Sequence, residues 1–106
     1  MIEHRQERRT QIDLTVQITG RDVRGNPFAQ SAVASSISGG SALLSGLARD
    51  VRAGDLVSIE YQDRKAWFRV VWAKSSQSEQ KIQAAVHRLE NEQCPWVALL
   101  EKSHQQ

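Results

Sequence analysis

The sequence predicts an all-β domain in which six antiparallel strands form a barrel or a sandwich, followed by a short C-terminal helix. Three observations support this prediction. Apolar and polar residues alternate in short runs, and a period of two is typical of half-buried strands. Clusters of turn-forming residues separate these runs at intervals of roughly ten residues. Only near the C-terminus does the apolar spacing change to that of a helix.

Length, composition and charge indicate one soluble domain. The chain has 106 residues, of which 25% are charged and 40% hydrophobic, as in ordinary globular domains. Its net charge of +2 is lower than expected for a protein that binds a nucleic acid polymer. Several cations gather in the first quarter of the chain, at Arg5, Arg8, Arg9, Arg21 and Arg24. This local excess fits a small anionic ligand better than a long polyanion.

The sequence also indicates the compartment. Cys94 is the single cysteine, which excludes an internal disulfide and fits a reducing environment. The N-terminal residues lack the apolar core of a signal peptide, and no run approaches the roughly 20 apolar residues of a membrane span. We therefore expect a cytoplasmic protein without a membrane span.

The first half of the chain contains three predicted strands. Residues 12–18 alternate strictly and form the first strand, and the Gly, Asn and Pro residues of 20–27 mark the turn that follows. Residues 28–37 form the second strand, although their small side chains weaken that interpretation. After a break at 38–41, residues 42–47 form the third strand.

Three further strands are predicted at 56–61, 66–74 and 81–89, with a tight polar turn at 62–65. Along the middle strand of these three, alternation places Trp72 on the same face as Phe68 and Val70. We therefore expect Trp72 to lie in the core.

A short amphipathic helix is predicted at residues 94–102. Pro95 suits the first helical position, and Trp96 begins an apolar stripe with i, i+3, i+4 spacing. Such a helix can close one mouth of a barrel, with the Trp96 ring in the core. Residues 103–106 are expected to fray.

Nothing in the sequence points to an enzyme. The three histidines are scattered, and no His/Cys cluster has the spacing of a metal site. The Gly-x-Ser-x-Gly and P-loop motifs are absent. Cys94 at a helix start could be an activated thiol, but a small, partly buried apolar side chain is the preferred interpretation. We therefore expect no catalytic residue, no metal and no cofactor.

Two segments are candidates for ligand binding. The basic arm at residues 4–9 contains Arg5 and Arg9, and each guanidinium can close on a phosphate or a guanine edge through two hydrogen bonds. The turn at residues 36–41 combines a glycine pair, which frees backbone N–H groups, with serine hydroxyls. The alternative for this second segment is a plain turn between two strands.

Taken together, these segments resemble the PilZ domain family. An Arg-x-x-x-Arg arm, a strand at 12–18 and a Ser-x-x-Gly-like turn follow one another in the family order. The segments 54–59, 69–72 and 84–89 resemble its later strands, so the resemblance covers nearly the whole chain. It implies a flexible arm at 1–11, and a six-stranded antiparallel barrel with a C-terminal helix at 12–102. It also implies a bacterial receptor for cyclic di-GMP.

The resemblance assigns a ligand-binding role to seven residues, Arg5, Arg8, Arg9, Ser36, Ser38, Gly40 and Ser41. It implies that Arg5 and Arg9 bind the phosphates and the guanine O6/N7 edge, with Arg8 as an extra cation. The family's second motif, Asp/Asn-x-Ser-x-x-Gly, falls on Ser36, Ser38 and Ser41, of which only Ser38 matches. Gly40 keeps a glycine beside the last position.

The two departures from the motif carry different costs. Ser36 replaces a carboxylate or amide, and losing one charged hydrogen bond costs roughly 1.5–3 kcal/mol. Ser41 replaces a glycine, which costs about 1–2 kcal/mol only if the backbone there has a positive φ.

The sequence leaves three functions open. The favoured one is a cyclic di-GMP receptor that acts on an unidentified effector protein in motility, biofilm or exopolysaccharide control. The alternative is a degenerate PilZ domain that has lost the ligand and acts by protein–protein contact. The third is a small barrel that binds single-stranded nucleic acid through Trp67 and Tyr61, which the modest net charge disfavours.

Overall fold

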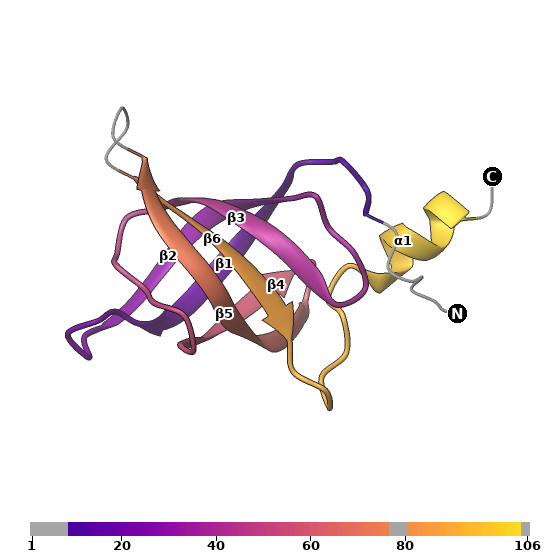
Figure 1. Cartoon of the computed structure of the whole chain (residues 1–106). Coiled ribbons are helices and arrows are strands. Elements are labelled where there is room, and N and C mark those ends of the chain that lie inside the picture. Colours follow the sequence, from indigo (N-terminus) through magenta and orange to yellow (C-terminus); the bar gives the residue numbers. More distant parts are fainter. Residues whose placement is uncertain (1–8, 77–80, 105–106) are drawn as a thin grey trace, which may run out of the picture.

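Six β-strands form a closed antiparallel barrel in the computed structural model, which describes residues 9–76 and 81–104 (Figure 1). The elements are β1 (Leu14–Arg21), β2 (Pro27–Ser35), β3 (Ser41–Leu47), β4 (Leu56–Tyr61), β5 (Arg64–Ser76), β6 (Lys81–Arg88) and helix α1 (Val97–His104). Around the barrel the strands follow the order β1-β2-β3-β6-β5-β4, and the pairing of β4 with β1 closes the ring. The predicted fold class is confirmed, and of the two forms considered the chain adopts the barrel.

Alternating side chains fill the inside of the barrel. On β1, Leu14, Val16 and Ile18 are buried, whereas the residues between them are exposed. On β4 and β5, Ile59 and Phe68 are also fully buried. Because successive side chains of a strand point to opposite faces, the period-two pattern of the sequence gives an apolar interior and a polar exterior.

The turn between β4 and β5 is shorter than predicted. Tyr61 pairs with Arg64, so only Gln62 and Asp63 lie between the two strands. Their φ angles are 50° and 69°. Two successive positive φ angles give the two-residue hairpin turn whose twist matches that of the flanking strands. The predicted turn at 62–65 is therefore too long.

The prediction that Trp72 lies in the core is wrong. The pairing of β5 with β6 shifts its register between Val70 and Trp72, which marks a β-bulge. A bulge inserts one extra residue and so changes the face on which the following residues lie. Val71 and Trp72 are 54% and 41% exposed, and Ala73 packs against the core instead.

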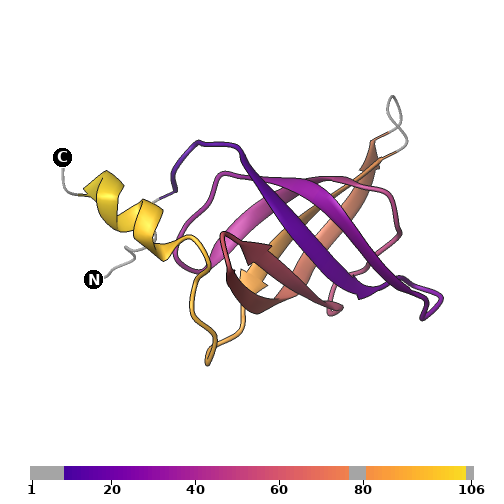
Figure 2. The same cartoon turned by 180° about the vertical axis from the view of Figure 1, so that it is seen from behind.

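Trp96 closes the barrel at the end where α1 lies. Its side chain is 1% exposed, and its ring centroid is 5.6 Å from that of Phe68. The chain leading into β1 lies at the same end of the barrel, as the view from behind shows (Figure 2). The prediction that Trp96 belongs to the core between barrel and helix is confirmed.

The helix itself differs from its prediction at both ends. α1 begins at Val97, so Pro95 precedes the helix and does not occupy its first position. It continues to His104, two residues beyond its predicted end at residue 102, while 105–106 lie outside the described residues. The fraying expected for 103–106 stays a prediction. The described part of the chain contains no helix with the length and apolar character needed to cross a membrane.

The bulge makes a stability prediction with a matched control. Val70→Ala removes two buried methyl groups and should lower the free energy of unfolding by about 2 kcal/mol, through lost burial and a cavity. Val71→Ala makes the same change at an exposed position and should cost less than about 1 kcal/mol. Urea unfolding followed by Trp fluorescence measures both variants. Equal losses would contradict the observed register of β5.

Candidate functional site

The two segments predicted to bind a ligand meet in the structure. Arg9 Nη1 donates hydrogen bonds to the Ser36 carbonyl oxygen at 2.5 Å and to its Oγ at 3.4 Å. Gln11 Nε2 donates to the same Oγ at 3.3 Å. Thr10 and Ile37 exchange two backbone hydrogen bonds of 2.7 and 3.0 Å. Residues 9–11 therefore lie along the turn at 36–41, whereas Arg5 and Arg8 lie outside the described residues.

Ser36 has an unusual backbone conformation. Its φ is 47°, in the left-handed region that L residues other than Asn and Asp rarely adopt. The PilZ motif has Asp or Asn at this position, and these are the residues that tolerate such a backbone. Replacing that residue by Ser therefore carries a conformational cost in addition to the loss of a carboxylate or amide.

Ser38 and Ser41 are buried and bind each other. Their Oγ atoms lie 2.9 Å apart, and the Ser38 N–H donates to the Ser41 carbonyl oxygen at 2.9 Å. Ser38 Oγ also accepts hydrogen bonds from the backbone N–H groups of Gly40, at 3.2 Å, and Ser41, at 3.1 Å. Both hydroxyls are engaged within the turn and fix its shape.

The replacement of the motif glycine by Ser41 carries no conformational cost. Ser41 is the first residue of β3. Among the described non-glycine residues, only Ser36, Gln62 and Asp63 have a positive φ. Of the two departures from the motif, only the one at Ser36 strains the backbone.

The carbonyl oxygen of Ser38 binds the segment that precedes α1. Trp96 Nε1 donates to it at 2.8 Å, and Cys94 Sγ lies 3.9 Å from it. Burial raises the pKa of the Cys94 thiol, and the backbone N–H of Trp96 and the Arg88 charge oppose this shift only in part. Cys94 is therefore a buried neutral thiol, as the preferred interpretation of the sequence expects.

Arg88 binds the Gly39–Gly40 part of the turn through hydrogen bonds, and the sequence did not predict this role. Its Nε donates to the Gly39 carbonyl oxygen at 2.9 Å. Its backbone N–H donates to the Gly40 carbonyl oxygen at 2.7 Å. Its Nη1 donates to the carbonyl oxygens of Leu89 and Glu92. Because Gly39 is 49 positions away in the chain, no local pattern could reveal the contact.

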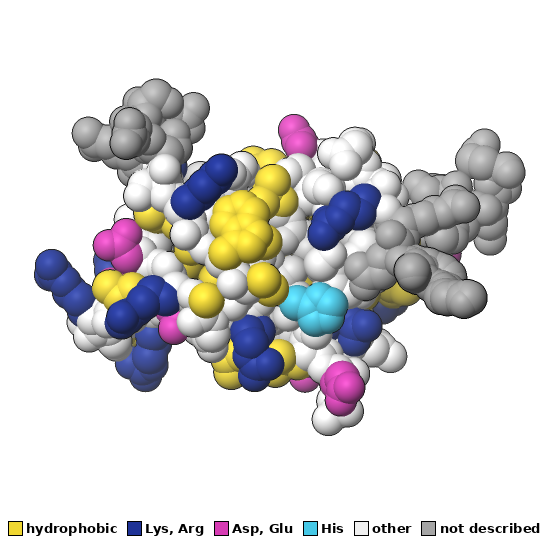
Figure 3. Space-filling model, in the orientation of Figure 1, with side chains coloured by type: hydrophobic (Ala, Val, Ile, Leu, Met, Phe, Trp, Pro, Cys, Tyr) yellow, Lys and Arg dark blue, Asp and Glu magenta, His cyan; other side chains and the backbone are white. Residues whose placement is uncertain are grey.

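An exposed aromatic ring lies on the outer face of the barrel, three strands away from the residue that precedes this turn. Ser35 pairs with Leu43, Leu43 with Ala85, and Ala85 with Trp72. Three interstrand steps put Trp72 about 14 Å from Ser35. Hydrophobic side chains gather in the middle of this face, with Lys and Arg around them (Figure 3). Lys74 Nζ lies 5.7 Å from the centroid of the Trp72 ring.

Comparison with known proteins identifies a fold relative. The structure of the Bacillus subtilis inhibitor of motility (MotI/DgrA) is similar over 95% of this chain, with a TM-score of 0.61 and 20% sequence identity. The present chain spans about half of that protein, 49% of its length. This likeness supports a PilZ-like fold. Neither a scan against protein-family models nor a search of curated proteins finds a match.

The positive φ of Ser36 predicts how a glycine substitution there affects stability, and the same substitution at Ser35 is the control. Ser36→Gly should leave the free energy of unfolding unchanged or raise it by up to about 1 kcal/mol, because glycine relieves the strain of a positive φ. Ser35→Gly places glycine in an extended strand and should lower it by about 0.5–1 kcal/mol. Thermal unfolding compares the two. A larger loss for Ser36→Gly than for Ser35→Gly would show that Ser36 is not strained.

Proposed function

We propose that this protein is a PilZ-type receptor for cyclic di-GMP that couples the nucleotide to a partner protein in a bacterium. The observation that carries the proposal is the contact between Arg9 and Ser36, which brings the basic arm beside the second motif segment. The structural relative is by its name an inhibitor of motility, which favours motility over biofilm or exopolysaccharide control as the regulated process. The proposed receptor works in the cytoplasm and needs no catalytic group.

Charge complementarity supports a cyclic dinucleotide. The ligand carries two phosphodiester charges. We propose that Arg5 and Arg9 bind them, with Arg8 as a third cation. The contacts of Arg9 with Ser36 use one nitrogen of a guanidinium that has five N–H donors. Further donors can therefore serve a phosphate or a guanine O6/N7 edge, and a bidentate contact of this kind is worth about 1–3 kcal/mol.

The turn at 36–41 would give the site its shape and would offer the ligand a weak hydrogen-bond acceptor. The Ser36 hydroxyl takes the place of the motif's carboxylate or amide, which costs roughly 1.5–3 kcal/mol, or about ten- to over a hundredfold in affinity. The hydroxyls of Ser38 and Ser41 hold the turn, with Gly40 between them. Trp72 on the adjoining face offers an exposed ring on which a guanine can stack.

A second function is favoured by the same turn. The buried hydroxyls of Ser38 and Ser41 satisfy each other, and the charged acceptor of the motif is replaced at position 36. A turn of this kind is stable without a ligand. The protein would then be a PilZ-like interaction module that no longer binds cyclic di-GMP.

Calorimetric titration with cyclic di-GMP tests the proposed function. The wild-type protein should bind in the micromolar range, and Arg9→Ala should weaken binding by at least about tenfold, because a charged bidentate donor is lost. Arg21→Ala is the matched control, since Arg21 is exposed at the other end of β1 and donates to the Gly25 carbonyl oxygen. Equal binding by the two variants would contradict a role for the arm.

The variant Ser36→Asp separates the two candidate functions. If the protein is a weak receptor, the restored carboxylate should raise its affinity by about tenfold or more. Binding by Ser36→Asp alone, with none by the wild type, would identify a vestigial site and favour the interaction module. Absence of binding by both proteins would exclude the nucleotide as a ligand.

A further inference from the structure

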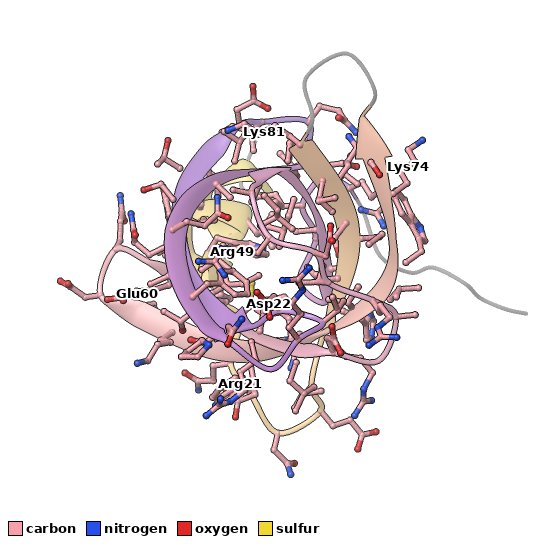
Figure 4. The ribbon with its side chains drawn as sticks, turned by 90° about the vertical axis from the view of Figure 1, so that its left-hand side faces the viewer. Arg21, Asp22, Arg49, Glu60, Lys74 and Lys81 are labelled. Carbon is pink, nitrogen blue, oxygen red and sulfur yellow. The ribbon has the colours of Figure 1, made fainter. Side chains whose placement is uncertain are left out.

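The end of the barrel opposite α1 carries a charged surface that the proposed nucleotide site does not use. It is formed by the β1–β2 hairpin turn, the loop at 48–55 and the adjoining ends of β5 and β6. Viewed along this end, Asp22 and Arg49 lie across the mouth of the barrel (Figure 4). Lys74 and Lys81 lie at its rim.

The carboxylates at this end hold the loops in place. Asp22 Oδ1 accepts hydrogen bonds from the backbone N–H groups of Arg24 and Asn26, both at 3.0 Å. Its Oδ2 accepts one from Arg49 Nη1 at 2.9 Å. Partial desolvation opposes ionisation of Asp22, but these hydrogen bonds and the Arg49 charge outweigh it and lower its pKa. Asp55 Oδ2 likewise accepts from the Arg52 backbone N–H at 2.8 Å.

The cations at this end therefore exceed the acids available to neutralise them. Three adjoining hollows are lined by five basic side chains, those of Arg24, Arg49, Arg52, Lys74 and Lys81. The same hollows include two carboxylates, Asp22 and Asp50. With Asp55 as a third carboxylate at this end, five cations face three acids, and the excess of two positive charges equals the net charge of +2 of the whole chain. Within the described residues of this end, the ion pair formed is that between Arg49 and Asp22.

A partly apolar hollow lies among these cations. It has a volume of about 380 Å³, and the apolar part of its lining is formed by Val23, Val51, Ala73 and Ile82. Arg52 and Lys74 stand at its edges, both with exposed side chains. A pocket of this size takes one or more apolar side chains, and the surrounding cations favour an acidic neighbourhood for them.

The strand pairing leaves part of an edge open at this end. Each described strand has a neighbour on both sides, but the pairing of β5 with β4 ends at Arg69, whereas β5 continues to Ser76. The cations and the hollow are side-chain features, so we expect the partner to bind through side chains, with an anchor in the hollow and charges around it.

We propose that this basic end of the barrel binds an acidic segment of a partner protein whose apolar side chain occupies the hollow between the 48–55 loop and β5. The apolar lining residues offer no contact to a phosphate backbone, whereas they can hold an apolar side chain of a peptide. A concave surface also fits a peptide segment better than a flat lipid bilayer. The surface deepens the partner coupling of the proposed function, and it does not depend on nucleotide binding.

Fluorescence anisotropy with a labelled, glutamate-rich peptide that contains leucine tests this surface on the full chain without nucleotide. The protein should bind this peptide, and should bind it less tightly as salt is added. Replacing glutamate by glutamine, or leucine by alanine, should weaken binding by at least about tenfold. A single-stranded oligonucleotide and phosphatidylglycerol vesicles are the competing probes.

Charge reversal on the protein locates the surface. The double variant Arg52→Glu with Lys74→Glu, and separately Lys81→Glu, should each weaken peptide binding by about tenfold or more. Arg64→Glu, an exposed cation at the α1 end, is the matched control and should leave binding unchanged. Circular dichroism confirms that each variant is folded.

Three outcomes would overturn the proposal. They are equal binding of the acidic and glutamine peptides, an equal effect of Arg64→Glu, and tighter binding of the oligonucleotide or the vesicles. Because this titration contains no cyclic di-GMP, its failure leaves the nucleotide titration standing. Failure of the nucleotide titration equally leaves the peptide result standing.

Discussion

The hydrogen bond from Trp96 to the Ser38 carbonyl oxygen joins the barrel core to the candidate site. The Trp96 ring fills the mouth of the barrel against Phe68, and its buried indole N–H requires an acceptor. The turn at 36–41 supplies that acceptor at 2.8 Å. The position of the turn is therefore set by the packing that closes the core. Arg88 adds a second attachment through the Gly39 carbonyl oxygen.

The two halves of the candidate site, the turn at 36–41 and residues 9–11, are held in place by different contacts. The turn is held by the core, by Arg88 and by its own serine hydroxyls, so its shape is fixed before any ligand arrives. Residues 9–11 are attached to it by the Thr10–Ile37 backbone pair and by side-chain hydrogen bonds of 2.5 to 3.4 Å from Arg9 and Gln11 to Ser36. A preformed turn lowers the ordering cost of binding, and an arm held by few bonds can exchange them for a ligand.

The sequence predicted the fold well because the fold follows from a repeated local pattern. Alternation identifies each strand, and the spacing of Trp96 identifies the helix that closes the barrel. Trp72 shows the limit of that reasoning, because one inserted residue at a bulge reverses every later inward or outward assignment on the strand. A bulge is created by the pairing with β6, which alternation along β5 alone does not contain.

The candidate site could be predicted only in part. The resemblance directed attention to the arm and to Ser36, Ser38 and Ser41, and the structure brings Arg9 of the arm beside Ser36. Three features arise only in the folded structure: the positive φ of Ser36, the mutual hydrogen bond of the buried serine hydroxyls, and the role of Arg88. These features depend on a backbone angle or on contacts between separate residues. The types of residue in the sequence reveal neither the angle nor the contacts.

Nuclear magnetic resonance of the ¹⁵N-labelled chain during titration with cyclic di-GMP tests most directly whether the arm and the turn form one site. If they do, amide signals of residues 9–11 and 36–41 should shift together, while those of the basic end at 22–26 and 48–55 stay unchanged. Shifts confined to the basic end, or no shifts in 9–11 and 36–41 at millimolar ligand, would contradict the claim that the arm and the turn form one site.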